Sequence, residues 1–124
     1  METDPITVSA STPINELVEE YFYKYHFKMY PVVDNSKLVG FINTHMVKEI
    51  PKENWKLRNV GEIARECSDE NCVRPDADAM DALSKMSQSG NSRLLVLEDG
   101  ELVGIITLKD MITFLSMKMD IEND

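Results

Sequence analysis

The residues best suited to chemistry in this chain are Thr107 and Asp110, which lie three residues apart where an apolar strand is expected to lead into a helix. An ionised carboxylate in a first helical turn can accept two hydrogen bonds from a diol, at about 1.5–3 kcal/mol for each charge-assisted bond. The N–H groups at the same helix N-terminus favour a phosphate. The same spacing is also that of a capping box, in which the two side chains only close the helix end. Both interpretations stay open at the level of sequence.

The chain contains an internal duplication that places this pair in context. The segment Pro31–Ile42 (PVVDNSKLVGFI) returns as Leu95–Ile106 (LVLEDGELVGII), and Gly40 and Gly104 lie 64 residues apart. Each copy is an apolar run, a short polar turn and a second apolar run, a pattern typical of two antiparallel strands. Either half alone would bury too little surface to be stable, so we expect the two copies to share a core.

Comparison of the copies predicts that they differ in chemistry. Asn43 and Met46 stand in the first copy where Thr107 and Asp110 stand in the second. A methionine sulfur is at best a weak hydrogen-bond acceptor. We therefore expect at most one binding site of this kind in each chain, built mainly by the second copy.

Periodicity predicts the same order of elements, strand-helix-strand-strand-helix, in both copies. In the first copy, Thr12 is the expected N-cap of a helix that starts at Pro13, and in the second Asp78 and Gly90 are the expected caps. The Asp99-Gly100 turn is the strongest hairpin signal. The expected strands are residues 7–8, 29–33, 38–42, 72–73, 93–97 and 102–106, with helices near 13–25, 44–49, 78–89 and 108–119.

Composition limits the classes of function. The 124 residues are 43% hydrophobic and carry a net charge of -9, which opposes long-range attraction to nucleic acid or anionic membranes. No apolar stretch approaches the roughly 20 residues of a membrane span, and no signal peptide is recognisable, so we expect a soluble domain. Cys67 and Cys72 fit reduced thiols better than a metal site. Catalytic motifs are absent from the sequence, so we do not expect an enzyme.

One strand end carries a resemblance to a known family. Gly104-Ile105-Ile106-Thr107-Leu108-Lys109-Asp110 matches the pattern Gly-apolar-x-Thr/Ser-x-x-Asp at every position, and the duplicated chain resembles a tandem pair of CBS domains, or Bateman module. The resemblance implies an α+β fold of two β-α-β-β-α repeats with pseudo-two-fold symmetry, often assembled as a homodimer. We expect repeats at residues 1–50 and 67–119, a linker at 51–66 and an acidic tail at 120–124.

The resemblance also implies a ligand. Such pairs accept adenosine-containing ligands such as AMP, ADP, ATP or S-adenosylmethionine in the cleft between the repeats, as regulators rather than required cofactors. In that interpretation, Asp110 accepts from the ribose diol and Thr107 lies at a phosphate-binding helix end. Arg93 occupies the place of a phosphate-facing cation, and Val73 and Leu95 supply apolar walls for the adenine ring.

A finer likeness concerns the protein to which such a pair is attached. The segments Glu20–Tyr25, Tyr30–Val33 and Val47–Pro51, with Trp55, resemble the CBS pair of site-2-protease-like membrane metallopeptidases. This implies a cytoplasmic part of a larger protein, without the peptidase's metal-binding helix. Two hypotheses remain: a regulatory module that binds an adenosine ligand, and a structural or dimerisation module that binds none.

Overall fold

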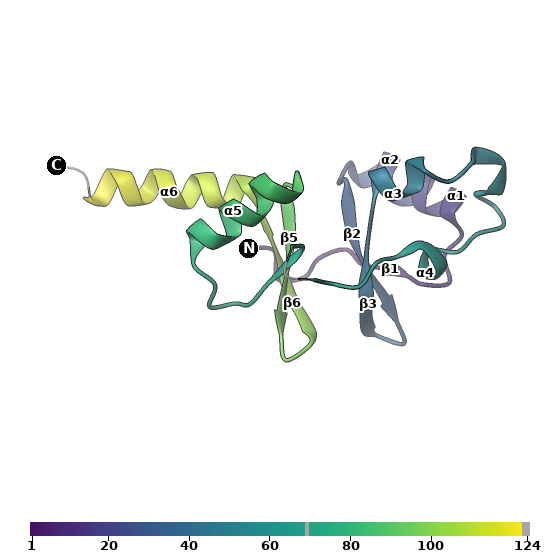
Figure 1. Cartoon of the computed structure of the whole chain (residues 1–124), viewed down its shortest axis with the longest axis horizontal. Coiled ribbons are helices and arrows are strands. Elements are labelled where there is room, and N and C mark those ends of the chain that lie inside the picture. The colour runs from purple at the N-terminus through teal and green to yellow at the C-terminus, as the bar shows by residue number, and fades with distance from the viewer. Residues whose placement is uncertain (69, 123–124) are drawn as a thin grey trace. The chain divides into compact units, whose positions relative to one another are not determined.

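The computed structural model describes residues 1–68 and 70–122 and divides the chain into two compact units (Figure 1). The first unit is residues 6–67, and the second joins residues 1–5 to residues 68–124. Each contains a three-stranded sheet and helices in the predicted order, which confirms the α+β class and the two tandem repeats. Among the described residues, helices long and apolar enough to cross a bilayer are not found.

The first unit builds its sheet in the order β1-β2-β3, with β1 parallel to β2 and β2 antiparallel to β3. Its helix between β1 and β2 is interrupted by a π-helical turn, η1, which periodicity did not predict. The elements are β1 (Val8–Ser9), α1 (Ile14–Leu17), η1 (Val18–Phe22), α2 (Tyr23–Tyr25), β2 (Met29–Asp34), β3 (Lys37–Asn43) and α3 (Thr44–Lys48).

The start of α1 corrects one prediction. The residue that caps this helix is Pro13, not Thr12, and it makes no side-chain capping bond. The reason lies in the segment between the repeats, because the carbonyl of Arg58 accepts the N–H of Ile14 at 3.0 Å. The carbonyl of Thr12 in turn accepts the N–H of Val60 at 2.8 Å. A backbone contact from a distant segment therefore satisfies a helix-end N–H group in place of a side chain.

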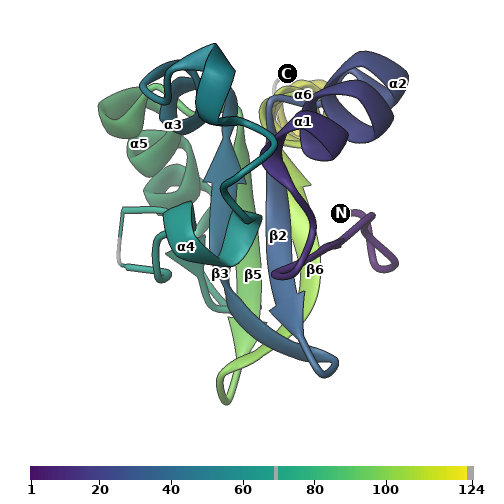
Figure 2. The same cartoon turned by 90° about the vertical axis from the view of Figure 1, so that its right-hand side faces the viewer.

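The segment predicted as a polar linker carries structure of its own. It contains a 3-10 turn, η2 (Lys52–Asn54), and a short helix, α4 (Val60–Ile63), which was not predicted. Helix α4 contacts β1 and β3, and Figure 2 shows it next to β3. The indole N–H of Trp55 donates to the carbonyl of Ile50 at 3.0 Å. This bond connects the segment to Ile50, at the end of the predicted first repeat.

The second unit repeats the sheet in the order β4-β5-β6. Asp78 accepts the N–H of Met80 at 2.9 Å, and Gly90 adopts a left-handed φ of 73°, so both predicted caps of α5 are confirmed. The elements are β4 (Cys72–Val73), α5 (Ala79–Ser89), β5 (Arg93–Glu98), β6 (Glu101–Thr107) and α6 (Leu108–Glu122). Helix α6 is longer than predicted, and the rest of the expected tail, residues 123–124, lies outside the described residues.

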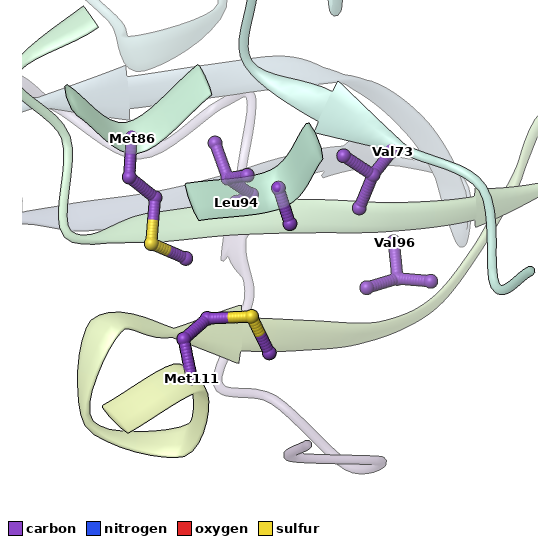
Figure 3. Close-up of a cluster of buried hydrophobic side chains, with 6 residues drawn as sticks. Val73, Met86, Leu94, Val96 and Met111 are labelled. Carbon is purple, nitrogen blue, oxygen red and sulfur yellow. The ribbon is translucent and has the colours of Figure 1, made fainter. Parts of the chain in front are cut away.

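One face of this sheet packs against α5 and α6 and forms a hydrophobic core (Figure 3). Leu94 and Val96, two residues apart on β5, both point toward the helices, because every second side chain of a strand lies on the same face. Met86 of α5 and Met111 of α6 cover them, and Val73 of β4 completes the cluster with Ala82. The residues between them on β5 therefore face the other side of the sheet.

Each sheet receives one further residue at the free edge of its last strand. In the second unit, Glu2 exchanges two backbone hydrogen bonds of 2.9 Å with Ile105 of β6. A Cβ atom at the neighbouring Gly104 would meet the carbonyl oxygen of Glu2, so this edge requires a glycine. The first unit repeats the arrangement between Arg65 and Phe41 of β3.

Candidate functional site

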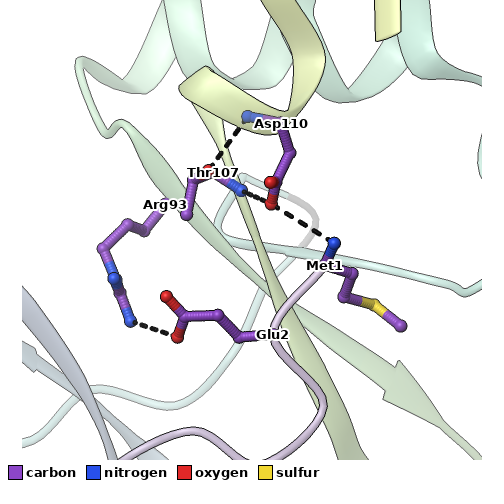
Figure 4. A network of polar contacts seen from close by, with 5 residues as sticks. All are labelled: Met1, Glu2, Arg93, Thr107 and Asp110. Carbon is purple, nitrogen blue, oxygen red and sulfur yellow. Dashed lines mark hydrogen bonds and ion pairs between the residues drawn. The ribbon is translucent and has the colours of Figure 1, made fainter. Parts of the chain in front are cut away.

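Thr107 and Asp110 form the two reciprocal bonds of a capping box at the start of α6 (Figure 4). The N–H of Thr107 donates to Oδ2 of Asp110 at 3.1 Å, and the N–H of Asp110 donates to Oγ1 of Thr107 at 3.1 Å. The capping role that the spacing allowed is therefore present. It does not use up the carboxylate, since both the Thr107 N–H and the Met1 ammonium contact Oδ2 and a carboxylate offers about four acceptor positions.

The environment of Asp110 keeps its carboxyl ionised. Partial burial alone would raise the pKa of Asp110, but hydrogen bonds to the Thr107 N–H and hydroxyl and the charge of the Met1 ammonium outweigh it and lower the pKa. The ammonium nitrogen lies 3.5 Å from Oδ2, and the Asp110 side chain is 35% exposed. At neutral pH the site thus offers a negative, partly accessible acceptor.

Strand register brings three predicted site residues to one face of the second sheet. Arg93 of β5 pairs directly with Thr107 of β6, and Leu95 pairs with Ile105. Paired residues point to the same face, and so do residues two apart on one strand. Arg93, Leu95 and Thr107 therefore share the face opposite the helix-packed core, with the start of α6 at the end of this face.

Arg93 is buried beneath a carboxylate that sequence reasoning missed. Its side chain is 8% exposed, and its guanidinium Nη2 lies 3.4 Å from Oε2 of Glu2 (Figure 4). Glu2 reaches this position because its backbone pairs with Ile105, whose side chain shares the face of Arg93. No sequence motif predicts the contact between Glu2 and Arg93. The only available signal was Gly104, whose missing Cβ leaves room for an extra chain segment.

The two expected apolar walls lie on different faces of the sheet. Val73 pairs with Val96, so it points into the helix-packed core, where it is 4% exposed. Leu95 pairs with Cys72 and lies on the face of Arg93. Because residues on opposite faces are separated by the sheet, the two predicted wall residues do not line the same face.

The first unit lacks the acidic half of this arrangement. Oδ1 of Asn43 accepts the N–H of Met46 at 2.9 Å and caps α3 alone, while the Met46 side chain is buried at 3% exposure. Asn43 thus performs the capping that Thr107 and Asp110 share in the second unit. The fold tolerates loss of the acid because the cap needs only one of the two bonds.

Comparison with known families identifies the fold. The model of the family described as the CBS domain matches residues 1–52 and 60–117, which together make up most of the chain. The chain belongs to the CBS domain family. The resemblance suggested by duplication and by the Gly104–Asp110 motif is confirmed, and the two matched regions follow the two repeats of the fold.

Relatives and solved structures of other CBS proteins agree. A zinc metalloprotease, MJ0392 of Methanocaldococcus jannaschii, is 31% identical over 117 residues, which cover 94% of this chain and 31% of that protein. A CBS domain protein from Streptococcus pneumoniae TIGR4 superposes with a TM-score of 0.73 at 17% identity, covering 94% of this chain and 82% of that one. The CBS domain of a bacterial CNNM/CorC family Mg²⁺ transporter, solved in complex with ATP, gives 0.72 at 19%, covering 94% and 82%.

These comparisons establish the CBS fold, and the matched family model is not that of a catalytic domain. The chain spans about a third of the length of the curated relatives it matches. The structural neighbours are too distant in sequence to carry more than the fold. Ligand, attached domain and assembly of this chain are therefore matters of proposal.

Proposed function

We propose that this chain is a regulatory CBS pair whose second repeat binds one adenosine-containing ligand, such as AMP, ADP, ATP or S-adenosylmethionine. Binding biases the conformation of an attached domain, and the pair itself has no catalytic role. Asp110 accepts from the ribose diol, and the α6 N-terminus at Thr107 and the Arg93 guanidinium receive phosphate. Leu95 contacts the base, whereas Val73 supports the sheet from the core side.

The observation that carries this proposal is the convergence of three groups at one end of one sheet face. The capping box holds the ionised carboxylate of Asp110 beside the α6 N-terminus, and pairing of Arg93 with Thr107 places a guanidinium in the same row. A diol acceptor thus lies near a guanidinium that can bind phosphate oxygens and near the positive end of the α6 dipole. The ATP complex of the transporter's CBS domain supports the choice of an adenosine ligand.

The attached domain we favour is a membrane metallopeptidase in which this pair is the cytoplasmic portion. The similarity to the zinc metalloprotease MJ0392 supports this choice, since the chain matches less than a third of that protein and the rest is available for the peptidase. Regulation requires that the ligand bind two states of the whole protein with different affinities. The test is peptidase activity of the full-length protein with and without ligand.

Calorimetric titration of the purified chain with AMP, ADP, ATP and S-adenosylmethionine tests the binding step directly. We expect saturable heat with at least one of the four, at one ligand per chain. Absence of heat with all four, at protein concentrations that would reveal a Kd of about 1 mM, contradicts the proposal. Repeating the titration in the presence of adenosine distinguishes recognition of the nucleoside from nonspecific binding of the phosphate anion, because only the former is competed by adenosine.

A second candidate, a dimerisation module without a small ligand, is favoured by the surface of α6. Five large apolar side chains of this helix are about half exposed or more: Ile112, Phe114, Met117, Met119 and Ile121. Exposed apolar groups concentrated on one element are typical of a surface that another chain covers. We expect a homodimer, and light scattering at micromolar concentration that gives a monomeric mass contradicts this assembly.

A further inference from the structure

The contact between Glu2 and Arg93 places a carboxylate where the proposed function needs a phosphate. Glu2 is fixed by its backbone, because both of its main-chain hydrogen bonds go to Ile105. Its side chain lies on the face of Arg93, and its Oε2 is 3.4 Å from the guanidinium. A phosphate group and a glutamate carboxylate each present a pair of negatively charged oxygen acceptors, which a guanidinium can bind with two parallel N–H donors.

We propose that Glu2 is a specificity residue of the CBS site, which holds Arg93 and thereby lowers the affinity for phosphate-bearing adenosine ligands relative to phosphate-free ones. The inference rests on the proposed function, since it assumes that the adenosine ligand lies against Arg93 and Asp110. It adds a residue from the other end of the sequence to the site and assigns it a discriminating role.

Burial makes the competition unequal between the two partners of the pair. The Arg93 side chain is 8% exposed and the Glu2 side chain 40% exposed. A buried guanidinium keeps a counter-charge, because an uncompensated buried charge is costly. The more exposed carboxylate can turn into solvent while its backbone stays paired. A phosphate therefore binds Arg93 by displacing the Glu2 side chain, and the lost ion pair reduces its affinity.

Charge in the neighbourhood acts in the same direction. A phosphate at Arg93 also lies near the ionised carboxylate of Asp110, at the end of the same sheet face, and like charges repel more strongly at partly buried sites. A ligand with more phosphate charge meets more of this repulsion. An uncharged nucleoside does not experience this repulsion, and its ribose diol can still donate hydrogen bonds to Asp110.

Titration of three forms of the chain with adenosine and with AMP tests the inference. Glu2→Gln removes the charge but keeps the backbone pairing, and Asp4→Asn is the matched control, because Asp4 is an exposed carboxylate two residues away in the same segment. We expect Glu2→Gln to raise AMP affinity by about three- to tenfold, between the values of exposed and buried charge pairs. Adenosine affinity should stay within about twofold, and Asp4→Asn should change neither.

The double variant Glu2→Gln with Arg93→Gln tests whether Glu2 changes AMP affinity through Arg93. If Glu2 acts through Arg93, the gain in AMP affinity disappears in the double variant. A gain that persists without Arg93, an equal gain for adenosine, an equal gain in Asp4→Asn, or no gain at all overturns the role of Glu2 while leaving adenosine binding intact. If no form binds either ligand, the role of Glu2 is overturned, and the proposed adenosine site is wrong as well when ADP, ATP and S-adenosylmethionine also give no heat.

Discussion

Asp110 is the residue whose replacement separates ligand binding from helix capping most sharply. Asp110→Ala removes the carboxylate that would accept from a ribose diol, at a cost of roughly 1.5–3 kcal/mol, or about ten- to 150-fold in ligand affinity. The same change removes the acceptor of the Thr107 N–H, which caps α6 at 3.1 Å. Loss of a cap costs about 1 kcal/mol, or about 3–6 °C in Tm for a domain of this size.

A matched control for the capping effect exists in the first repeat. Asn43→Ala removes one capping bond at the equivalent helix start, the 2.9 Å bond from the N–H of Met46 to the N-cap side chain, where no carboxylate is present. Calorimetric titration and thermal unfolding are measured on both variants. We expect similar losses in Tm and a loss of affinity in Asp110→Ala alone. Equal losses in Tm with unaltered affinity in both variants would refute the binding role and leave Asp110 as a cap only.

Three further predictions follow from the same structure. Titration should saturate at one nucleotide per chain, and Met46→Ala should leave affinity unchanged while it lowers stability by about 2–5 kcal/mol, because that side chain is buried. Gly104→Ala should lower the free energy of unfolding by about 1–3 kcal/mol in a denaturant titration, because the new Cβ would meet the Glu2 carbonyl oxygen. Contacts with Arg58 and Asn59 lower the pKa of Glu62, and that of Asp110 is also lowered, so Tm should fall on acidification below about pH 4, and less in Glu62→Gln.

The sign of the pH effect follows from the direction of both shifts. A carboxyl whose pKa is lower in the folded state stabilises the fold above its unfolded pKa, and that stabilisation is lost as pH falls through the folded pKa. Glu62 accepts from the Arg58 guanidinium at 2.7 Å and from the Asn59 N–H at 3.3 Å, and protonation weakens both contacts. A Tm that falls equally steeply in Glu62→Gln would show that other carboxyls dominate acid unfolding.

Local pattern predicted the elements whose residues interact with near neighbours. Both hairpins are specified by alternating apolar residues and by a turn, and the structure places β5 at Arg93–Glu98 where residues 93–97 were expected. The caps Asp78 and Gly90 act within one helical turn, and both were found. The errors arise where a contact with a segment distant in sequence determines the local structure. Helix α1 starts after Pro13 because Arg58 supplies its capping contact, and a π-helical turn inside an apolar stripe leaves little trace in periodicity.

In the candidate site, too, the features set by local contacts could be predicted, and those set by distant contacts could not. The capping geometry of Thr107 and Asp110 and the shared face of Arg93 and Thr107 follow from spacing and strand alternation, which a sequence displays. The face of Val73 could not be predicted, because no turn sets the register of the short parallel strand β4 relative to β5, and a shift of one residue exchanges its faces.

The position of Glu2 could not have been predicted from local pattern at all, because it depends on pairing between the start of the chain and β6. That pairing has a physical consequence for how a CBS repeat changes its ligand preference. In the proposed site, the residues that hold a nucleoside belong to the strand and helix of the second unit, whereas the charge set against its phosphate comes from Glu2 at the start of the chain. If Glu2 has the role proposed above, substitution of this half-buried edge residue alters phosphate preference without disturbing the capping box, the sheet register or the core beneath it.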